Sequence, residues 1–536
     1  MKRTYKYLLV SALVAPMMLS TACVEETFPT NGATQEQLAA SSKATEALLW
    51  AMPAYFNKYD LLSSSQAYDW GYGSMMHIRD VMTADYAIVS SGYDWYTAWE
   101  QNSYIGQGYM STQYIWNFYN KQVLTCNNIL GAVDLETASD VQKGYYGMGL
   151  AFRASTYLDM ARMYEFLLND GTEPVSPDGK DVLGLTVPIV TEKTTEEESR
   201  NNPRAPHKEM LDFIISDLDQ AEEIISLATR SAKTLPDLSV VYGLKARAYM
   251  WDENYTQAAE YARKAIATGQ YTPTTRDQWL STTSGFNEPI SSWMWCFQAV
   301  KEDDAVQSGI INWTSWSSNE AQYGYAAAGP FNMIGAELYN KINDRDFRKL
   351  SFKAPEGTPL SGQEPVLDAA FAAELPEYSS FKFRPGSGNT ADYNVGSATA
   401  VPLMRIEEMY LIEAEAVAHT SPAQGKQLLE DFMKTYRYPT YTCRGTSEEE
   451  VVDEIFLQKR IEFWGEGLSF FDYKRLNKPV VRAYAGTNFA TPTLFNTTTR
   501  PAWMNFVIIQ SEGTSNLAVK DYNNPDPSGC YPLVTL

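Results

Sequence analysis

Apolar residues recur at helical spacing along most of the chain, and this pattern predicts a mostly α-helical protein. Several of the predicted helices follow one another after short polar connections, which is typical of antiparallel helix pairs. The predicted helices span residues 35–55, 113–133, 143–168, 209–227, 238–251, 255–268, 402–416, 423–436 and 447–464.

The helix over 447–464 has the most clearly marked ends. Ser447 and Glu450 have the spacing of a capping box, in which each side chain bonds the backbone N–H of the other residue. Gly465 is a suitable stop, because glycine adopts a left-handed cap at little cost. A second short helix is predicted over 468–476, and Pro479 prevents its continuation.

Two long stretches, 62–110 and 271–400, interrupt the helical pattern with Gly, Ser, Pro, Thr and many aromatic residues. Within the second stretch, residues 290–300 alternate large aromatic residues with other side chains, which predicts a strand. The expected architecture is therefore mostly α, with long loop-rich insertions and a few short strands. Loops of this length inside a compact unit are usually functional.

The segment 255–268 reads YTQAAEYARKAIAT and resembles the first helix of a tetratricopeptide repeat. Its alanines permit close approach of two helices. No strict repeat period survives along the chain, so we expect degenerate helical pairs. Stacked pairs of this kind form a curved scaffold that exposes a binding surface, although a scaffold does not specify its ligand.

The stretch around the capped helix resembles the C-terminal signature of the SusD/RagB family of outer-membrane lipoproteins. The matching residues are Asp453, Glu454, Ile455, Gln458, Arg460, Ile461, Glu462, Phe463, Gly465, Glu466, Gly467, Phe470, Phe471, Asp472, Lys474 and Arg475. A second signature of the family matches residues 402–416. We expect the charged signature residues Arg460, Glu462, Glu466, Asp472 and Arg475 to form internal ion pairs and loop caps rather than ligand contacts.

The resemblance implies a SusD-like fold and a division of the chain into regions. These are a lipoprotein signal peptide (1–22), a lipid-anchored tether (23–34), an N-terminal helical region (35–270) with an aromatic loop (62–110), a loop-rich ligand-binding region (271–404) and a C-terminal helical region (405–536).

The N-terminus has the features of an exported lipoprotein. A basic start precedes an apolar run over 7–19, which is too short to span a bilayer. Small residues then precede Cys23, as in a bacterial lipobox, so Cys23 is the predicted lipidation site; secretion with cleavage nearby is the alternative. Glu25 and Glu26 resemble the surface-export signal of Bacteroidota lipoproteins. The predicted location is the outer membrane, with the protein lipid-anchored and facing the exterior.

Composition excludes several other classes of protein. The formal net charge of −22 makes nucleic acid an unsuitable partner. Three histidines (His77, His207 and His419) share no ligand spacing, so no metal site and no cofactor are predicted. Four cysteines are expected to be buried free thiols, because they form no Cys-x-x-Cys pair. They are Cys126, Cys296, Cys443 and Cys530.

The aromatic residues of the two loop stretches are the candidate ligand site. Trp and Tyr combine a flat apolar face with a polar group, which suits the C–H face and hydroxyls of a pyranose. The resemblance to the family also implies an aromatic arc in such loops. The predicted ligand-binding residues are Tyr93, Trp95, Trp99, Trp313, Trp316 and Tyr325. Alternatively, these rings pad an interface with a partner protein, and Trp295, within the predicted strand, belongs to the core.

No catalytic motif is found: the chain lacks Gly-x-Ser-x-Gly, a Walker A loop, His-Glu-x-x-His and a complete dinucleotide fingerprint. The resemblance therefore implies binding without turnover. We expect a surface lipoprotein that binds a nutrient glycan and delivers it to a SusC-like TonB-dependent outer-membrane transporter, on which its helical face docks. The alternatives are capture of peptides or glycoprotein fragments by the same scaffold, and a glycoside hydrolase that uses two of the chain's 65 acidic residues.

Overall fold

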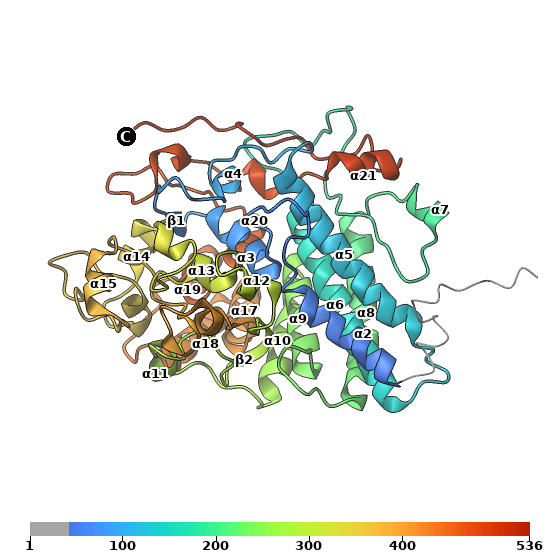
Figure 1. The fold of residues 1–536 in the computed structure, drawn as a ribbon, viewed down its shortest axis with the longest axis horizontal. Coiled ribbons are helices and arrows are strands. Elements are labelled where there is room, and N and C mark those ends of the chain that lie inside the picture. The colour runs from blue at the N-terminus through green and yellow to red at the C-terminus, as the bar shows by residue number, and fades with distance from the viewer. Residues whose placement is uncertain (1–41) are drawn as a thin grey trace, which may run out of the picture.

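The computed structural model describes residues 42–536 and is mostly α-helical (Figure 1). The predicted signal peptide, Cys23 and the tether lie outside the described residues. The longer helices are α2 (Ser42–Tyr55), α5 (Met110–Ala132), α6 (Asp140–Tyr164), α8 (His207–Ile224), α9 (Leu238–Trp251), α10 (Tyr255–Ala267), α17 (Ile406–Thr420), α18 (Pro422–Tyr436) and α19 (Glu448–Glu462).

Shorter elements occupy the connecting segments. The helices are α3 (Tyr72–Val81), α4 (Thr97–Glu100), α7 (Glu196–Ser199), α11 (Arg276–Trp279), α12 (Asp304–Gln307), α13 (Trp313–Ser317), α14 (Ala336–Lys341), α15 (Ala369–Glu374), α16 (Tyr393–Gly396), α20 (Ser469–Arg475) and α21 (Gln510–Ser515). The strands are β1 (Tyr86–Ile88), β2 (Trp293–Gln298), β3 (Asn332–Ile334) and β4 (Ala400–Arg405).

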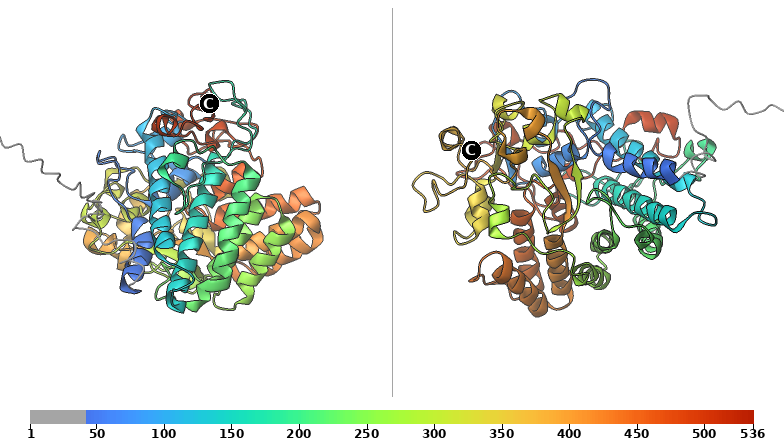
Figure 2. Two further views of the ribbon diagram at one scale, coloured as in Figure 1. Left: turned by 90° about the vertical axis from the view of Figure 1, so that its right-hand side faces the viewer. Right: turned by 60° about the horizontal axis from the view of Figure 1, so that its bottom comes forward.

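The long helices pack side by side in the order of the sequence, except for the last of them. From α5 the array runs through α6, α8, α9 and α10, then to α17 and α18, while α19 packs on α17 (Figure 2, left). Three alanines of α10, namely Ala258, Ala262 and Ala265, are fully buried. Their small side chains permit the close contact of α10 with α9 and α17. The predicted helical scaffold is confirmed.

One predicted helix is wrong in its first part. The segment expected to be helical from residue 402 begins as strand β4, and helix α17 starts only at Ile406. β4 pairs antiparallel with β2, with Trp293 opposite Arg405 and Phe297 opposite Val401. Its residues are buried on both faces, so their apolar run reflects a buried strand and not a helical stripe.

The predicted start of α19 is confirmed, and the helix ends at Glu462, two residues before the predicted end. Ser447 and Glu450 form the capping box, with the Glu450 N–H donating to Ser447 Oγ at 3.2 Å and the Ser447 N–H donating to Glu450 Oε2 at 3.1 Å. After α19, Gly465 and Gly467 take φ values of 75° and 67°, which L side chains rarely adopt. A Cβ on Gly467 would lie 2.7 Å from Met76 Cα, so this turn packs directly on α3.

A second two-stranded sheet joins the two aromatic loop stretches. β1, from the first stretch, pairs antiparallel with β3, from the second, with Tyr86 opposite Ile334 and Ile88 opposite Asn332. The predicted ligand-binding loops therefore meet in space although more than 200 residues separate them in sequence.

One large hydrophobic core runs from Leu49 to Tyr531 and takes residues from all three regions predicted for the mature chain. Cys126, Cys296 and Cys443 are buried free thiols as expected, while Cys530 is a free thiol that is only partly buried. Among residues 42–536, none of the helices has the length and apolarity needed to cross a bilayer.

Candidate functional site

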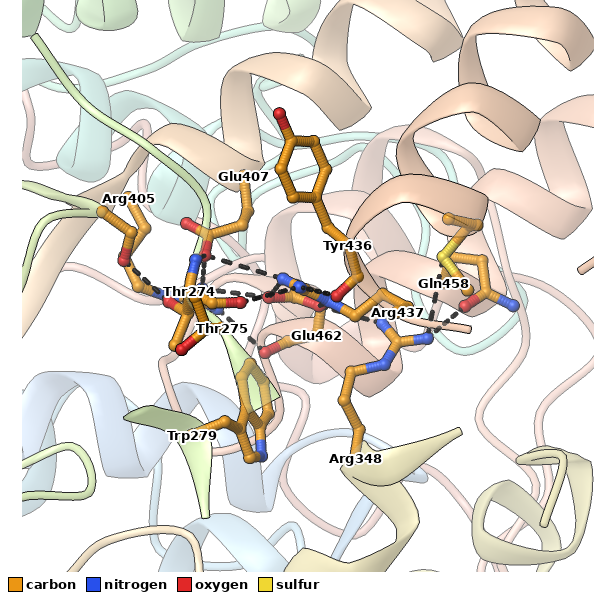
Figure 3. A network of polar contacts seen from close by, with 12 residues as sticks. Thr274, Thr275, Trp279, Arg348, Arg405, Glu407, Tyr436, Arg437, Gln458 and Glu462 are labelled. Carbon is orange, nitrogen blue, oxygen red and sulfur yellow. Dashed lines mark hydrogen bonds and ion pairs between the residues drawn. The ribbon is translucent and has the colours of Figure 1, made fainter. Parts of the chain in front are cut away.

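The signature residue Glu462 lies in a buried network of ion pairs and not at a surface (Figure 3). Its carboxylate accepts N–H bonds from Arg348 at 2.9 Å, Arg405 at 2.9 Å and Arg437 at 2.6 and 2.7 Å. All four side chains have no exposed surface. Burial favours the neutral acid, but the three guanidinium charges outweigh it and hold the pKa of Glu462 well below its usual range.

The other charged signature residues are also internally paired. Arg460 donates to Asp85 at 2.9 Å, which ties α19 to the segment before β1. Glu466 accepts from Lys382 at 2.6 Å. Asp472 accepts from Arg475 at 2.6 Å within α20. The expectation that this signature forms internal ion pairs is confirmed, so it supports the fold beneath the loops.

Three of the predicted ligand-binding rings are in the core, and for these the prediction is wrong. Trp99, Trp313 and Trp316 are only 2, 4 and 2% exposed. The Trp316 indole N–H donates to the Ala67 carbonyl at 3.1 Å. The Trp313 ring packs edge-on against Phe383, with centroids 5.1 Å apart. Rings held in this way have no free face for a ligand.

The polar residues around Trp313 and Trp316 explain the error. The sequence from Asn312 to Asn319 reads NWTSWSSN and looks like an exposed loop. Its hydroxyl and amide side chains are nevertheless buried, and several bond backbone groups. For example, Asn312 Oδ1 accepts from the Ser315 N–H at 3.0 Å and caps α13. Hydrogen bonds of this kind make a polar sequence compatible with burial.

The other three predicted rings reach the surface. Tyr93 and Trp95 are 59 and 42% exposed, and Tyr325 is half-buried. The Tyr325 ring stacks on buried Trp316 at 4.1 Å and 17°, so the core supports it from within. The loops that carry these rings adjoin each other, because a Cβ on Gly329 would lie 3.7 Å from Ser91 Cβ. The structure thus brings Tyr93, Trp95 and Tyr325 into one region.

The loop of Tyr93 and Trp95 is anchored by the next residue. Tyr96 is fully buried, and its hydroxyl accepts from the Trp70 indole N–H at 2.8 Å. The Tyr96 N–H donates to Asp94 Oδ1 at 2.8 Å, which closes a local turn. The two exposed rings therefore flank a fixed turn, and ordering them for a ligand costs less entropy than ordering a free loop.

Further exposed rings in the same stretch were not among the sequence-based candidates. Tyr104 and Tyr109 are 64 and 42% exposed, and their rings meet edge-on at 5.3 Å. Met110 is 42% exposed, and Ser64 Oγ lies 3.5 Å from its Sδ, so the 60–67 loop borders these rings. Their setting in SYIGQGYM, between glycines and small polar residues, is the signal that could have identified them.

A carboxyl pair lies at the base of the Trp95 loop. Burial raises the pKa of Glu100 well above its usual range, and the negative charge of Asp94 adds to this. Burial likewise raises the pKa of Asp94, while hydrogen bonds from Glu100 and the Tyr96 N–H oppose the shift. Each of the two carboxyl groups therefore holds a proton more readily than an exposed acid does.

A groove between two helices and the arrangement of possible metal ligands are the other surface features. A groove of about 800 Å³ lies between α14 and α19, and two of its acidic residues are paired with lysines, Glu337 with Lys341 and Asp453 with Lys478. Within residues 42–536, no three His, Cys, Asp or Glu side chains gather as a set of metal ligands.

The fold and both signatures agree with comparisons to known proteins. Residues 46–250 match a family model described as starch-binding, associating with the outer membrane, and residues 297–522 match the SusD family model. The chain belongs to the SusD/RagB family. A SusD-like protein of Formosa agariphila is 24% identical over 405 residues, which cover 69% of this chain and 73% of that protein.

Solved structures show the same fold. A SusD-like carbohydrate binding protein from Bacteroides vulgatus superposes with a TM-score of 0.70 at 23% identity, covering 90% of this chain and 98% of that one. A SusD superfamily protein from Bacteroides thetaiotaomicron gives a TM-score of 0.67 at 18% identity, with 90 and 99% covered. The helical array with loop-rich insertions is thus the SusD-like fold.

Proposed function

We propose that the protein is a surface-exposed outer-membrane lipoprotein that binds a nutrient glycan and passes it to a SusC-like TonB-dependent transporter. The observation that carries this proposal is the cluster of exposed rings on adjoining loops, supported from within by a buried aromatic core. We call these rings the ring surface; it comprises Tyr93, Trp95 and the half-buried Tyr325, together with the Tyr104–Tyr109 pair farther along the first loop stretch.

The chemistry of the ring surface suits a carbohydrate. Flat aromatic faces pack on the C–H faces of pyranose rings, and tyrosine hydroxyls add hydrogen-bonding groups. Ser63 and Ser65 on the 60–67 loop are exposed, as is Gln322 near Tyr325, and they offer further partners for sugar hydroxyls. A family model described as starch-binding and relatives described as carbohydrate or sugar binding proteins support the same ligand class.

The anchor and the transporter partner complete the proposal. Lipidation of Cys23 would tether the protein to the outer membrane, because more than one acyl chain gives stable anchoring. The helical array provides a broad face for docking on a barrel, while the ring surface binds the glycan. Pull-down of the tagged protein from native outer membranes is expected to recover a large barrel protein, and recovery of none would contradict this part of the proposal.

The glycan site is tested by affinity electrophoresis in gels that contain polysaccharides. Replacing Trp95 by alanine removes an exposed ring, so we expect retention by the bound polysaccharide to fall by at least about fivefold. Trp50→Ala is the matched control, because Trp50 is 37% exposed and belongs to helix α2 and not to a ring-bearing loop. Equal retention of the wild type and both variants would contradict the site, and new reducing ends during incubation would contradict binding without turnover.

A further inference from the structure

The loops at the ring surface are rich in carboxylates and poor in cations. Four segments line this part of the molecule: 57–66, 89–110, 299–330 and 386–399. They contain only two lysines, Lys58 and Lys301, and no arginine. Their acidic residues outside the core are Asp60, Asp94, Glu302, Asp303, Asp304 and Asp392, while Glu100 and Glu320 are buried.

Several of these carboxylates lie next to the rings. A Cβ on Gly324, the residue before Tyr325, would lie 3.1 Å from the Gly309 carbonyl oxygen, so the segment that carries Asp303 and Asp304 adjoins Tyr325. Asp303 accepts from the Asn57 amide at 3.2 Å, which joins this segment to the 57–66 segment that carries Asp60. The carboxylates of these two segments therefore lie on the Tyr325 side of the ring surface.

The arginines beneath this surface are already bound to buried partners. Arg384 pairs with Glu320, and both side chains are buried. Arg482 is also buried and donates to the backbone carbonyls of Val81, Thr83 and Glu100. These guanidinium groups cannot reach a ligand outside without breaking buried interactions.

The excess of carboxylates over free cations disfavours ligands that carry negative groups. A uronate or a sulfate on a sugar is normally bound by arginine or lysine, often in a bidentate pair. At the ring surface such a group would meet carboxylates, and like charges at short range repel. Neutral hydroxyls carry no such penalty, because carboxylates accept hydrogen bonds from them.

We propose, building on the proposed function, that the ring surface selects uncharged glycans and rejects those that carry uronate or sulfate groups. The selectivity comes from the carboxylate-rich loops around the rings, with exposed contributions from Glu302, just before α12, and from Asp304, its first residue. The rings provide the affinity for the sugar, and the carboxylates lower the affinity for glycans that carry negative groups.

The first test compares one polysaccharide in its unmodified, carboxymethylated and hydroxyethylated forms. Starch, laminarin, galactan and mannan are screened as neutral probes, and the polysaccharide that is retained is then carboxymethylated or hydroxyethylated to the same extent. We expect the carboxymethyl form to bind at least about fivefold more weakly than the hydroxyethyl form, and the difference to shrink in 0.5 M salt because salt screens exposed charges. The neutral derivative controls for the bulk of the added group.

The outcomes separate the two proposals. Equal or tighter binding of the carboxymethyl form, or retention of only alginate, polygalacturonate or chondroitin sulfate, would overturn charge selection and leave glycan binding intact. Retention of no polysaccharide at all would overturn the proposed function together with this inference.

The second test changes the charges directly. The double variant Glu302→Lys/Asp304→Lys is expected to lose most of the discrimination against the carboxymethyl form while retaining the hydroxyethyl form. The control Glu136→Lys/Asp178→Lys makes the same change in net charge; Glu136 is exposed beyond the end of α5 opposite to Tyr109, and Asp178 is exposed in the 175–181 turn. Discrimination that falls equally in both variants would show an effect of net charge and overturn the assignment to these loops.

Discussion

Replacing Glu462 by glutamine tests whether the family signature serves the fold. Its buried network contains four cations and four carboxylates, which balance. They are Arg348, Lys382, Arg405 and Arg437, and Asp346, Glu407, Glu462 and Glu466. Glutamine has nearly the same shape but no charge, so the variant leaves one positive charge unbalanced in the interior.

The expected cost is large. Glu462 accepts four guanidinium N–H bonds of 2.6–2.9 Å, and its side chain has no exposed surface. Removing one partner of a buried ion pair typically costs about 3–5 kcal/mol. Glutamine also turns an N–H₂ group toward the guanidinium groups, which removes an acceptor. We therefore expect Glu462→Gln to lower the free energy of unfolding by about 3–5 kcal/mol.

The assay is urea denaturation followed by tryptophan fluorescence, with Glu449→Gln as the control on the exposed face of the same helix. The control is expected to change stability by less than about 0.5 kcal/mol. Adding Arg437→Gln to Glu462→Gln restores the balance of charge, so the double variant is expected to lose less than the sum of the two single variants.

The pH dependence gives a separate check. The pKa of Glu462 is lowered in the folded protein, so its contribution is fully present above its unfolded pKa of about 4.3 and is lost as the pH falls toward the folded value. The stability gap between wild type and Glu462→Gln should therefore be constant from pH 8 to 5 and narrow below about pH 4. A loss under about 1 kcal/mol at pH 7, or glycan retention that falls more than the folded fraction, would refute the structural role.

Three further predictions follow from individual residues. Trp316→Ala removes a 2% exposed ring and is expected to lower the free energy of unfolding, measured by urea denaturation, by about 3–5 kcal/mol. Trp95→Ala is expected to lower it less and mainly to reduce glycan retention. The reverse order of the two losses would refute the assignment of core and surface rings. Burial disfavours the charged imidazolium, but two neighbouring carboxylates raise the pKa of His207, so its contribution is fully present below about pH 6.5 and is lost as the pH rises through the folded value. The melting temperature of His207→Gln should thus fall further below wild type at pH 5.5 than at pH 9, and an equal gap would contradict this. Gly467→Ala is expected to cost at least about 2 kcal/mol, and more than Gly486→Ala, because both glycines have positive φ but a Cβ meets other atoms only at Gly467.

The sequence alone determined the helical scaffold and its family. Apolar periodicity and the capping box gave the course and the ends of helices such as α9 and α19, because these depend on neighbours within a few residues. The charged signature was also interpreted correctly, since five interleaved acids and bases beside a core helix need partners wherever they are buried.

Only the tertiary structure decided which rings face the solvent. Trp95 and Trp316 both stand in polar sequence, yet Trp95 is exposed and Trp316 is sealed by Tyr325 and the Ala67 carbonyl. Strand β4 likewise depends on β2, which lies about 100 residues earlier in the chain. Burial is a property of contacts between segments distant in sequence, so local composition reports what a side chain could bind but not whether anything else covers it.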